Sequence, residues 1–183
     1  MSAQKLEILK KLLNEEKNTA APLNPELCYK IHSALELPQN LINHMLAVRD
    51  EALGICRALN ENGLCLDTEL IESAALIHDI CRDEPKHPYA AAELLRKLGY
   101  FREARIIEQH HELKNEIIDE AAVVYLADKY IKEDKKVSLE ERFSQSSKKC
   151  LSPEAENANS RRYAQALNIE ILIKNIIKTQ LPL

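Results

Sequence analysis

The chain has 183 residues and a formal net charge of −4, with 4% aromatic residues, no tryptophan and only three glycines. This composition favours helices over strands and hairpin turns, and the length suits one domain with a sizeable core. Acidic and basic residues are interleaved without a dense basic block, which argues against a nucleic-acid partner. No apolar segment is long enough to span a membrane.

The first 13 residues carry charges among their apolar positions, so they do not resemble a signal peptide. The cysteines form no C-x-x-C pair. With no export signal, we expect reduced thiols and a cytoplasmic protein. The cysteines are Cys28, Cys56, Cys65, Cys81 and Cys150.

Apolar residues recur at helical spacing along most of the chain, and start and stop signals divide them into successive helices. Asn24 and Pro25 are typical of an N-cap and the first residue of a helix, and Asp67 is typical of another N-cap. Gly63 stands where a helix is expected to stop. The predicted helices cover, in chain order, residues 5–13, 25–35, 40–60, 68–80, 89–98, 102–112, 116–131, 138–150 and 153–178, with a polar linker at 18–23 and a charged loop at 81–87.

Three polar positions interrupt apolar helical stretches: His44, the pair His78-Asp79, and Asp128. Burying an ion without a partner costs on the order of several kcal/mol. One histidine on an apolar face is more often a hydrogen-bonded core residue than a ligand, and one aspartate is more often solvated or capping. A metal ion would satisfy three such positions on three helices at once. Two imidazoles and two carboxylates suit Fe, Mn, Co, Ni or Zn.

These residues resemble the H…HD…D signature of the HD-domain superfamily of metal-dependent phosphohydrolases. Further segments are similar to the superfamily's motifs in the same order, and all of them together span residues 40 to about 143. Two departures stand out, because Cys81 replaces the glycine of the common H-D-I-G motif and no G-Y-P tripeptide follows Glu112. The subfamily that cleaves cyclic dinucleotides carries this tripeptide, so the resemblance does not imply a cyclic dinucleotide as the substrate of this chain. The further segments are Lys86-His87-Pro88, Glu108-Gln109-His110-His111-Glu112, Tyr125-Leu126-Ala127-Asp128-Lys129 and residues 137–143.

The resemblance implies an all-α, single-domain helical bundle of the HD-domain type. The metal-dependent hydrolase core is expected over residues 40–143. Residues 1–39 are expected to form an N-terminal helical extension, and residues 144–183 to form C-terminal helices that pack on the same domain. Apolar faces on the first helix are compatible with a homodimer.

The resemblance also implies a site with two divalent transition-metal ions that are bridged by Asp79. The implied ligands are His44, His78 and Asp128 for the first ion and His87 and His110 for the second, with His111 nearby. Adjacent helical positions diverge by about 100°, so His110 and His111 reach one site only if it lies between their two faces. Otherwise one of them is a ligand and the other contacts a ligand residue or the substrate. The position of His110 in the resembled motif favours His110 as the ligand. His32 is expected to be an ordinary helix residue.

The implied reaction is hydrolysis of a phosphoester of a nucleotide or another small phosphorylated metabolite through a metal-bound hydroxide. Besides Asp79, Arg82 and Lys129 are expected to act by holding phosphate oxygens, and the alternative for each is a surface charge. Asp83 and Glu84 relay protons or belong to a solvated loop. Two other functions remain open: a di-iron oxygenase of the same superfamily, and a non-catalytic regulatory domain that binds metal or nucleotide.

Overall fold

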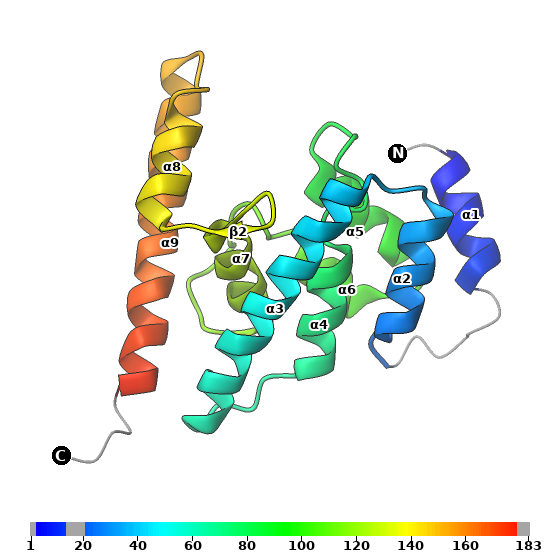
Figure 1. Cartoon of the computed structure of the whole chain (residues 1–183), viewed down its shortest axis with the longest axis horizontal. Helices are drawn as coiled ribbons and strands as arrows, with labels where there is room; N and C mark the ends of the chain where they lie inside the picture. Colours follow the sequence, from blue (N-terminus) through cyan, green and yellow to red (C-terminus); the bar gives the residue numbers. More distant parts are fainter. Residues whose placement is uncertain (1–2, 14–20, 179–183) are drawn as a thin grey trace.

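The computed structural model describes residues 3–13 and 21–178, and within them nearly all regular structure is helical. The predicted all-α fold is therefore confirmed (Figure 1). The helices of this described part are α1 (Ala3–Leu13), α2 (Pro25–Ala34), α3 (Gln39–Glu61), α4 (Thr68–Ile77), α5 (His87–Lys97), α6 (Phe101–Ile107), α7 (Glu120–Tyr130), α8 (Leu139–Ser147) and α9 (Pro153–Lys178). A short hairpin of β1 (Ile131–Lys132) and β2 (Lys135–Lys136) joins α7 to α8.

The long helix α3 runs through the middle of the molecule and packs against both α4 and α7 (Figure 1). Helices α1 and α2 lie on one side of it, and α2 contacts α4. On the other side, α8 and α9 form an antiparallel pair that contacts α7, and α9 also contacts α3. The predicted boundaries at residues 39 and 143 between extension, core and C-terminal helices stay a prediction.

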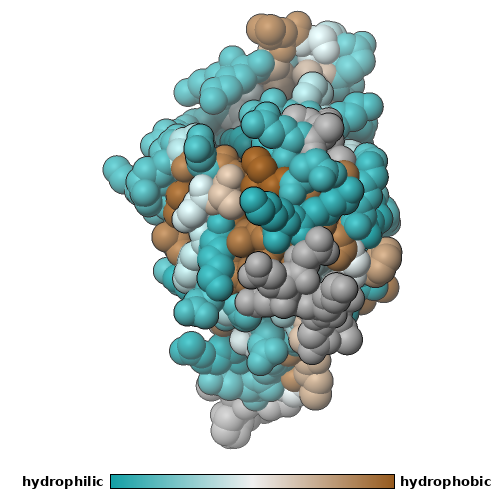
Figure 2. Space-filling model, turned by 90° about the vertical axis from the view of Figure 1, so that its right-hand side faces the viewer, coloured by the Kyte–Doolittle hydropathy of each residue, from teal (hydrophilic) through white to brown (hydrophobic). Residues whose placement is uncertain are grey.

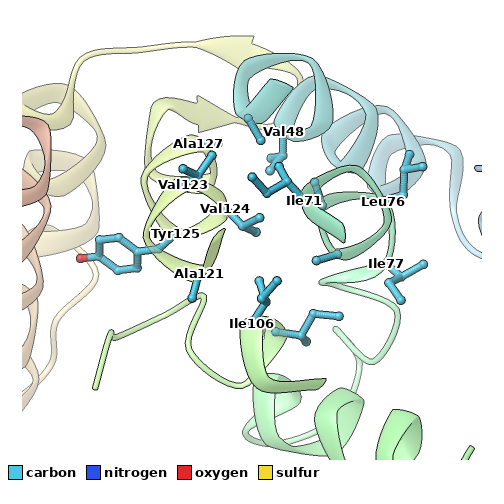
Figure 3. Packing of buried hydrophobic residues seen from close by; sticks show 14 of the residues in the cluster. Val48, Ile71, Leu76, Ile77, Ile106, Ala121, Val123, Val124, Tyr125 and Ala127 are labelled. Atoms are coloured by element: carbon cyan, nitrogen blue, oxygen red, sulfur yellow. The ribbon is translucent and has the colours of Figure 1, made fainter. Parts of the chain in front are cut away.

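The core lies where α3, α4, α6 and α7 meet. Val48 of α3, Ile71 of α4 and Val124 of α7 lie close together there, and none is exposed to solvent (Figure 3). Fully burying one such side chain contributes about 1.5–3 kcal/mol. Helix α7 is buried from Ala121 through Lys129, which explains why its sequence is apolar around most of the helix rather than along one stripe.

Two predicted helices end earlier than expected, and a predicted histidine ligand follows each of them. Helix α4 stops at Ile77 instead of residue 80, because the His78 ring nitrogen Nδ1 lies 2.8 Å from the Ala75 carbonyl. That carbonyl would otherwise accept the next N–H of the helix. Helix α6 stops at Ile107 instead of residue 112, where the Gln109 side-chain amide donates to the Arg105 carbonyl and the Gln109 N–H donates to the Ile106 carbonyl. Beyond this end, His110 Nδ1 lies 2.8 Å from the Ile107 carbonyl.

Helix α7 begins at Glu120, four residues later than the predicted start at residue 116. The Asp119 carboxylate accepts the Ala122 N–H at 3.0 Å and is therefore the N-cap. We expect Asp119→Ala to lower the free energy of unfolding by about 1 kcal/mol, measured by denaturant titration. Asp119→Asn keeps an acceptor at the cap and should stay within a few tenths of a kcal/mol of the unchanged protein. Equal losses in both variants would mean that the ion pair with Arg105, which both disrupt, matters instead of the cap.

The first helix packs its apolar face on the rest of the molecule. Leu9 is fully buried and Leu13 is 6% exposed. Figure 2 shows the side that carries α1, where hydrophilic residues cover most of the surface and apolar residues form small patches between them. The expected homodimer stays a prediction. The first half of the predicted linker at 18–23 lies outside the described residues, whereas Leu23 is buried and its N–H donates to Glu103 Oε1 at 2.9 Å.

None of the helices that the structure describes combines the length and the apolar character needed to cross a bilayer.

Candidate metal centre

Five helices bring the predicted ligands together from positions far apart in the sequence. Helix α3 contributes one histidine, the end of α4 contributes the His-Asp pair, and α5 begins with a histidine. Two more histidines follow α6, and α7 contributes an aspartate. Their ligand atoms form three overlapping groups, and within each group these atoms lie within 4.8 Å of one another. The groups are His44, His78 and Asp128; His78, Asp79 and His110; and His87, His110 and His111.

The two carboxylate oxygens of Asp79 face two different pairs of histidines. Oxygen Oδ2 lies 3.8 Å from His44 Nε2 and 3.6 Å from His78 Nε2. Oxygen Oδ1 lies 3.0 Å from His87 Nε2 and 3.5 Å from His110 Nε2. Asp79 is fully buried between the pairs, so one oxygen is available to each side.

The second carboxylate, Asp128, lies beside the first pair of histidines. Its Oδ1 is 3.2 Å from His44 Nε2 and 3.8 Å from His78 Nε2. Its Oδ2 accepts a hydrogen bond from Lys129 Nζ at 2.7 Å, and the same ammonium donates to the His110 carbonyl at 2.7 Å. Lys129 therefore connects α7 to the segment after α6 from a buried position.

Backbone carbonyls fix the orientation of three histidine rings. The Nδ1 atoms of His44, His78 and His110 lie 2.7–2.8 Å from the carbonyls of Glu133, Ala75 and Ile107. A carbonyl only accepts hydrogen bonds, so each Nδ1 carries the proton. When such a ring is in its neutral form, its Nε2 presents a lone pair toward the carboxylates, as metal-binding histidines do.

Several buried atoms of this cluster have no hydrogen-bond partner among the described residues. A buried polar atom left in this state costs roughly 1–3 kcal/mol. Finding several of them aimed at one point indicates that a bound group supplies the missing interactions. Imidazole nitrogens and carboxylate oxygens are ligands for divalent transition metals, so the donor set fits such ions. The unpartnered atoms are Asp79 Oδ1 and the Nε2 atoms of His44, His78, His87 and His110.

The protonation states also suit metal binding. Burial raises the pKa of Asp79, but the neighbouring His78, His110 and His87 outweigh it and hold this pKa well below its usual value. Burial likewise raises the pKa of Asp128, and Lys129 and the histidines lower it well below its usual value. Burial lowers the pKa of His78 to about 4. At neutral pH the carboxylates are therefore ionised and this imidazole is neutral, which are the forms that bind a metal.

His111 lies at the edge of the cluster. Its ring centroid is 4.6 Å from that of His87 and 4.5 Å from that of His110. Burial lowers the pKa of His111 to about 2, so this ring is neutral as well. Both adjacent histidines therefore reach the site, and His110 lies nearer its centre because its Nε2 faces Asp79.

Of the charged residues predicted beside the HD pair, Arg82 contacts the cluster. Its Nη1 donates to Asp79 Oδ2, while half of its side chain remains exposed. Asp83 instead forms an ion pair with Lys5 of α1 and is largely exposed. His32 lies outside the cluster and contacts the end of α4, with Nε2 2.6 Å from the Leu76 carbonyl.

Sequence reasoning missed the backbone that positions His44. Glu133 lies in the turn of the hairpin with φ at 57°, a left-handed conformation that costs a non-glycine residue roughly 1–2 kcal/mol. Its carbonyl is the acceptor for His44 Nδ1. Strained residues of this kind gather at functional sites, and Lys86, directly before His87, has φ at 54°. The sequence carries no glycine at either position that would indicate these turns.

We expect Glu133→Gly to keep the metal content, because the backbone carbonyl that holds His44 remains and glycine adopts positive φ freely. Glu133→Pro should lower the metal content and the free energy of unfolding, because proline fixes φ near −65°. Elemental analysis and denaturant titration of both variants measure these effects. Loss of metal from Glu133→Gly would show that the Glu133 side chain, rather than its backbone, supports the site.

Comparisons with known proteins agree with this geometry. The family model described as HD domain matches residues 41–132. The uncharacterized protein MJ0778 of Methanocaldococcus jannaschii is 33% identical over 76 residues, which cover 40% of this chain and 45% of that protein. The match therefore spans less than half of the relative's length. No solved structure matches the chain significantly. The matched segment is half of the chain and contains every predicted ligand, so the chain belongs to the HD domain family.

Proposed function

We propose that the protein is a metal-dependent phosphohydrolase that cleaves a phosphoester of a nucleotide or another small phosphorylated metabolite. Membership of the HD domain family implies the metal-dependent hydrolase superfamily. The observation that carries the proposal is the placement of Asp79, whose two oxygens face separate pairs of histidines. One carboxylate between two sets of donors is suited to two cations.

The ligand assignment follows from which oxygen each histidine faces. His44, His78 and Asp128 would hold one ion together with Asp79 Oδ2. His87 and His110 would hold the other with Asp79 Oδ1, and His111 would complete that side. Fe, Mn, Co, Ni and Zn all suit this donor set. When bound, such ions polarise a phosphoryl group and lower the pKa of water.

Residues of the chain itself prepare the site for an anionic substrate. The Arg82 guanidinium lies against Asp79 and is half exposed, so it can turn from this carboxylate to the oxygens of an entering phosphate. Its planar donors suit two parallel hydrogen bonds to a phosphate. Lys129 is committed to Asp128 and to the His110 carbonyl, so its role is to position the ligands from α7 and from the segment after α6.

The proposal is tested by loading the purified protein with each candidate metal and measuring phosphate release from nucleotides, sugar phosphates and dinucleotides. Release that depends on metal supports the proposal, and Asp79→Asn is the inactive control. Oxygen uptake is followed in the same assays. Oxygen uptake that requires iron, without phosphate release, would favour an oxygenase. Tight nucleotide binding without turnover across all the metals would favour a regulatory domain.

A further inference from the structure

Two cavities adjoin the candidate metal centre from different sides. The first has a volume of about 590 Å³, and His44 and Arg82 lie in its wall on the side of the metal centre. The second has a volume of about 390 Å³ and is bordered by His111 and Lys129. Ligand sites in proteins commonly measure about 300–1,000 Å³, so the first cavity alone is large enough for a nucleotide.

The two cavities share a wall that comes from α8 and the turn after it. Arg142 and Lys149 border both of them. Ser146, which borders the second cavity, lies one helical turn after Arg142, so both side chains project from one side of α8. This side of α8 therefore lines both cavities.

The shared wall is positively charged and lacks acidic partners. Neither Arg142 nor Lys149 forms an ion pair within residues 3–13 and 21–178. Lys132, in the wall of the first cavity, binds the amide oxygen of Gln145 and so keeps its full charge. The wall of the second cavity holds no carboxylate, whereas the first cavity also carries Glu36, Asp83 and Glu133, so an anion is attracted most to the side that both cavities share.

The first cavity also has an apolar side. Leu37, Pro38 and Leu41 border it next to His44. An apolar surface beside a cationic wall suits a molecule with a flat organic part and separate anionic groups. Arg142 and Lys149 lie outside the segment that matches the HD domain family, and Lys149 also lies outside the further motifs that resemble the superfamily.

We propose that Arg142 and Lys149 form a second anion subsite, and that the substrate is a nucleotide with a second phosphate group besides the one that is hydrolysed. One phosphate lies at the metal centre and the other binds the shared wall of the two cavities. Lys132 adds a third positive charge to this subsite. The inference rests on the proposed phosphohydrolase function and specifies its substrate class.

The inference is tested with adenosine 5′-monophosphate, adenosine 5′-diphosphate and adenosine 3′,5′-bisphosphate on the metal-loaded protein. We expect kcat/KM to be at least about 10-fold higher for one or both of the two-phosphate nucleotides, since charge-assisted hydrogen bonds are the strong ones. Arg142→Gln should raise KM for that nucleotide by about 10-fold with little change in kcat, and should raise KM for the monophosphate much less. Arg142→Lys keeps the charge and should retain part of the preference.

Lys148→Gln is the matched control, because it removes the same charge from an exposed neighbour that borders neither cavity. Equal kcat/KM for all three nucleotides in the unchanged protein, or an unchanged KM in Arg142→Gln, would overturn the inference. If no nucleotide is hydrolysed, the proposed function fails separately. Calorimetry on the metal-free protein then decides the subsite: tighter binding of a two-phosphate nucleotide that Arg142→Gln abolishes supports it, and equal binding of all three overturns it.

Discussion

Asp79→Asn is expected to remove both metal ions and to lower any phosphatase activity by at least about 100-fold. Changes to residues that only support a metal ligand already cost about 10- to 100-fold, and Asp79 faces histidines of both sides directly. An asparagine offers one oxygen and one NH₂ group, so it cannot give a negatively charged oxygen to each side. Elemental analysis of the purified variant measures the metal content, and circular dichroism checks that it is folded.

Two further variants make this result specific. Asp83→Asn changes the same side-chain type four positions later, in a residue that pairs with Lys5 away from the cluster, and should keep its metal. His44→Gln removes a ligand from one side alone, so it should lose one ion more readily than the other. Two ions retained by Asp79→Asn would contradict the bridging position of this carboxylate.

Ligands such as Asp128 and His44 could be predicted from the sequence because each is a polar residue within an apolar helical stretch. Asp128 is a carboxylate within a buried apolar run, and His44 lies on the apolar stripe of α3. Their elements all pack around one core, so polar residues on the inner faces of several helices meet at one place. The helical class followed from composition and spacing in the same way.

The local geometry that orients these ligands could not be predicted in this way. Helices α4 and α6 end where the His78 and His110 rings bind backbone carbonyls, and hydrophobic periodicity says nothing about ring orientation. The hairpin after α7 holds Glu133 in a left-handed conformation because its backbone carbonyl must reach His44, although the sequence has no glycine there to indicate such a turn. That requirement comes from α3, which lies almost 90 residues earlier in the chain.

The C-terminal helices show a similar limit. Spacing indicates that Arg142 and Ser146 share one side of a helix, but the sequence does not say which side faces the metal centre. The packing of α8 against α9 and α7 decides it. Phe143 is buried and lies 5.2 Å from Tyr163 of α9 between ring centroids, which turns Arg142 toward the cavities.

Lys129→Met is expected to lower the free energy of unfolding of the metal-free protein by about 3–5 kcal/mol, the usual cost of removing one partner from a buried ion pair. The ammonium of Lys129 is the partner of Asp128 Oδ2, and both side chains are at most 7% exposed. Methionine fills a similar volume but leaves the carboxylate without this partner. Denaturant titration of the metal-free protein measures the loss.

Lys136→Met provides the matched control, because the Nζ–Oε1 distance from Lys136 to Glu51 is also 2.7 Å but the lysine side chain is 63% exposed. Water screens this pair, so its loss should cost less than about 1 kcal/mol. Equal losses in the two variants would contradict the argument that burial makes the difference.

Lys129 also repels any cation bound beside Asp128, so Lys129→Met should bind Mn²⁺ more tightly. Because binding and folding are linked, added Mn²⁺ should then raise the unfolding midpoint of Lys129→Met more than that of the unchanged protein.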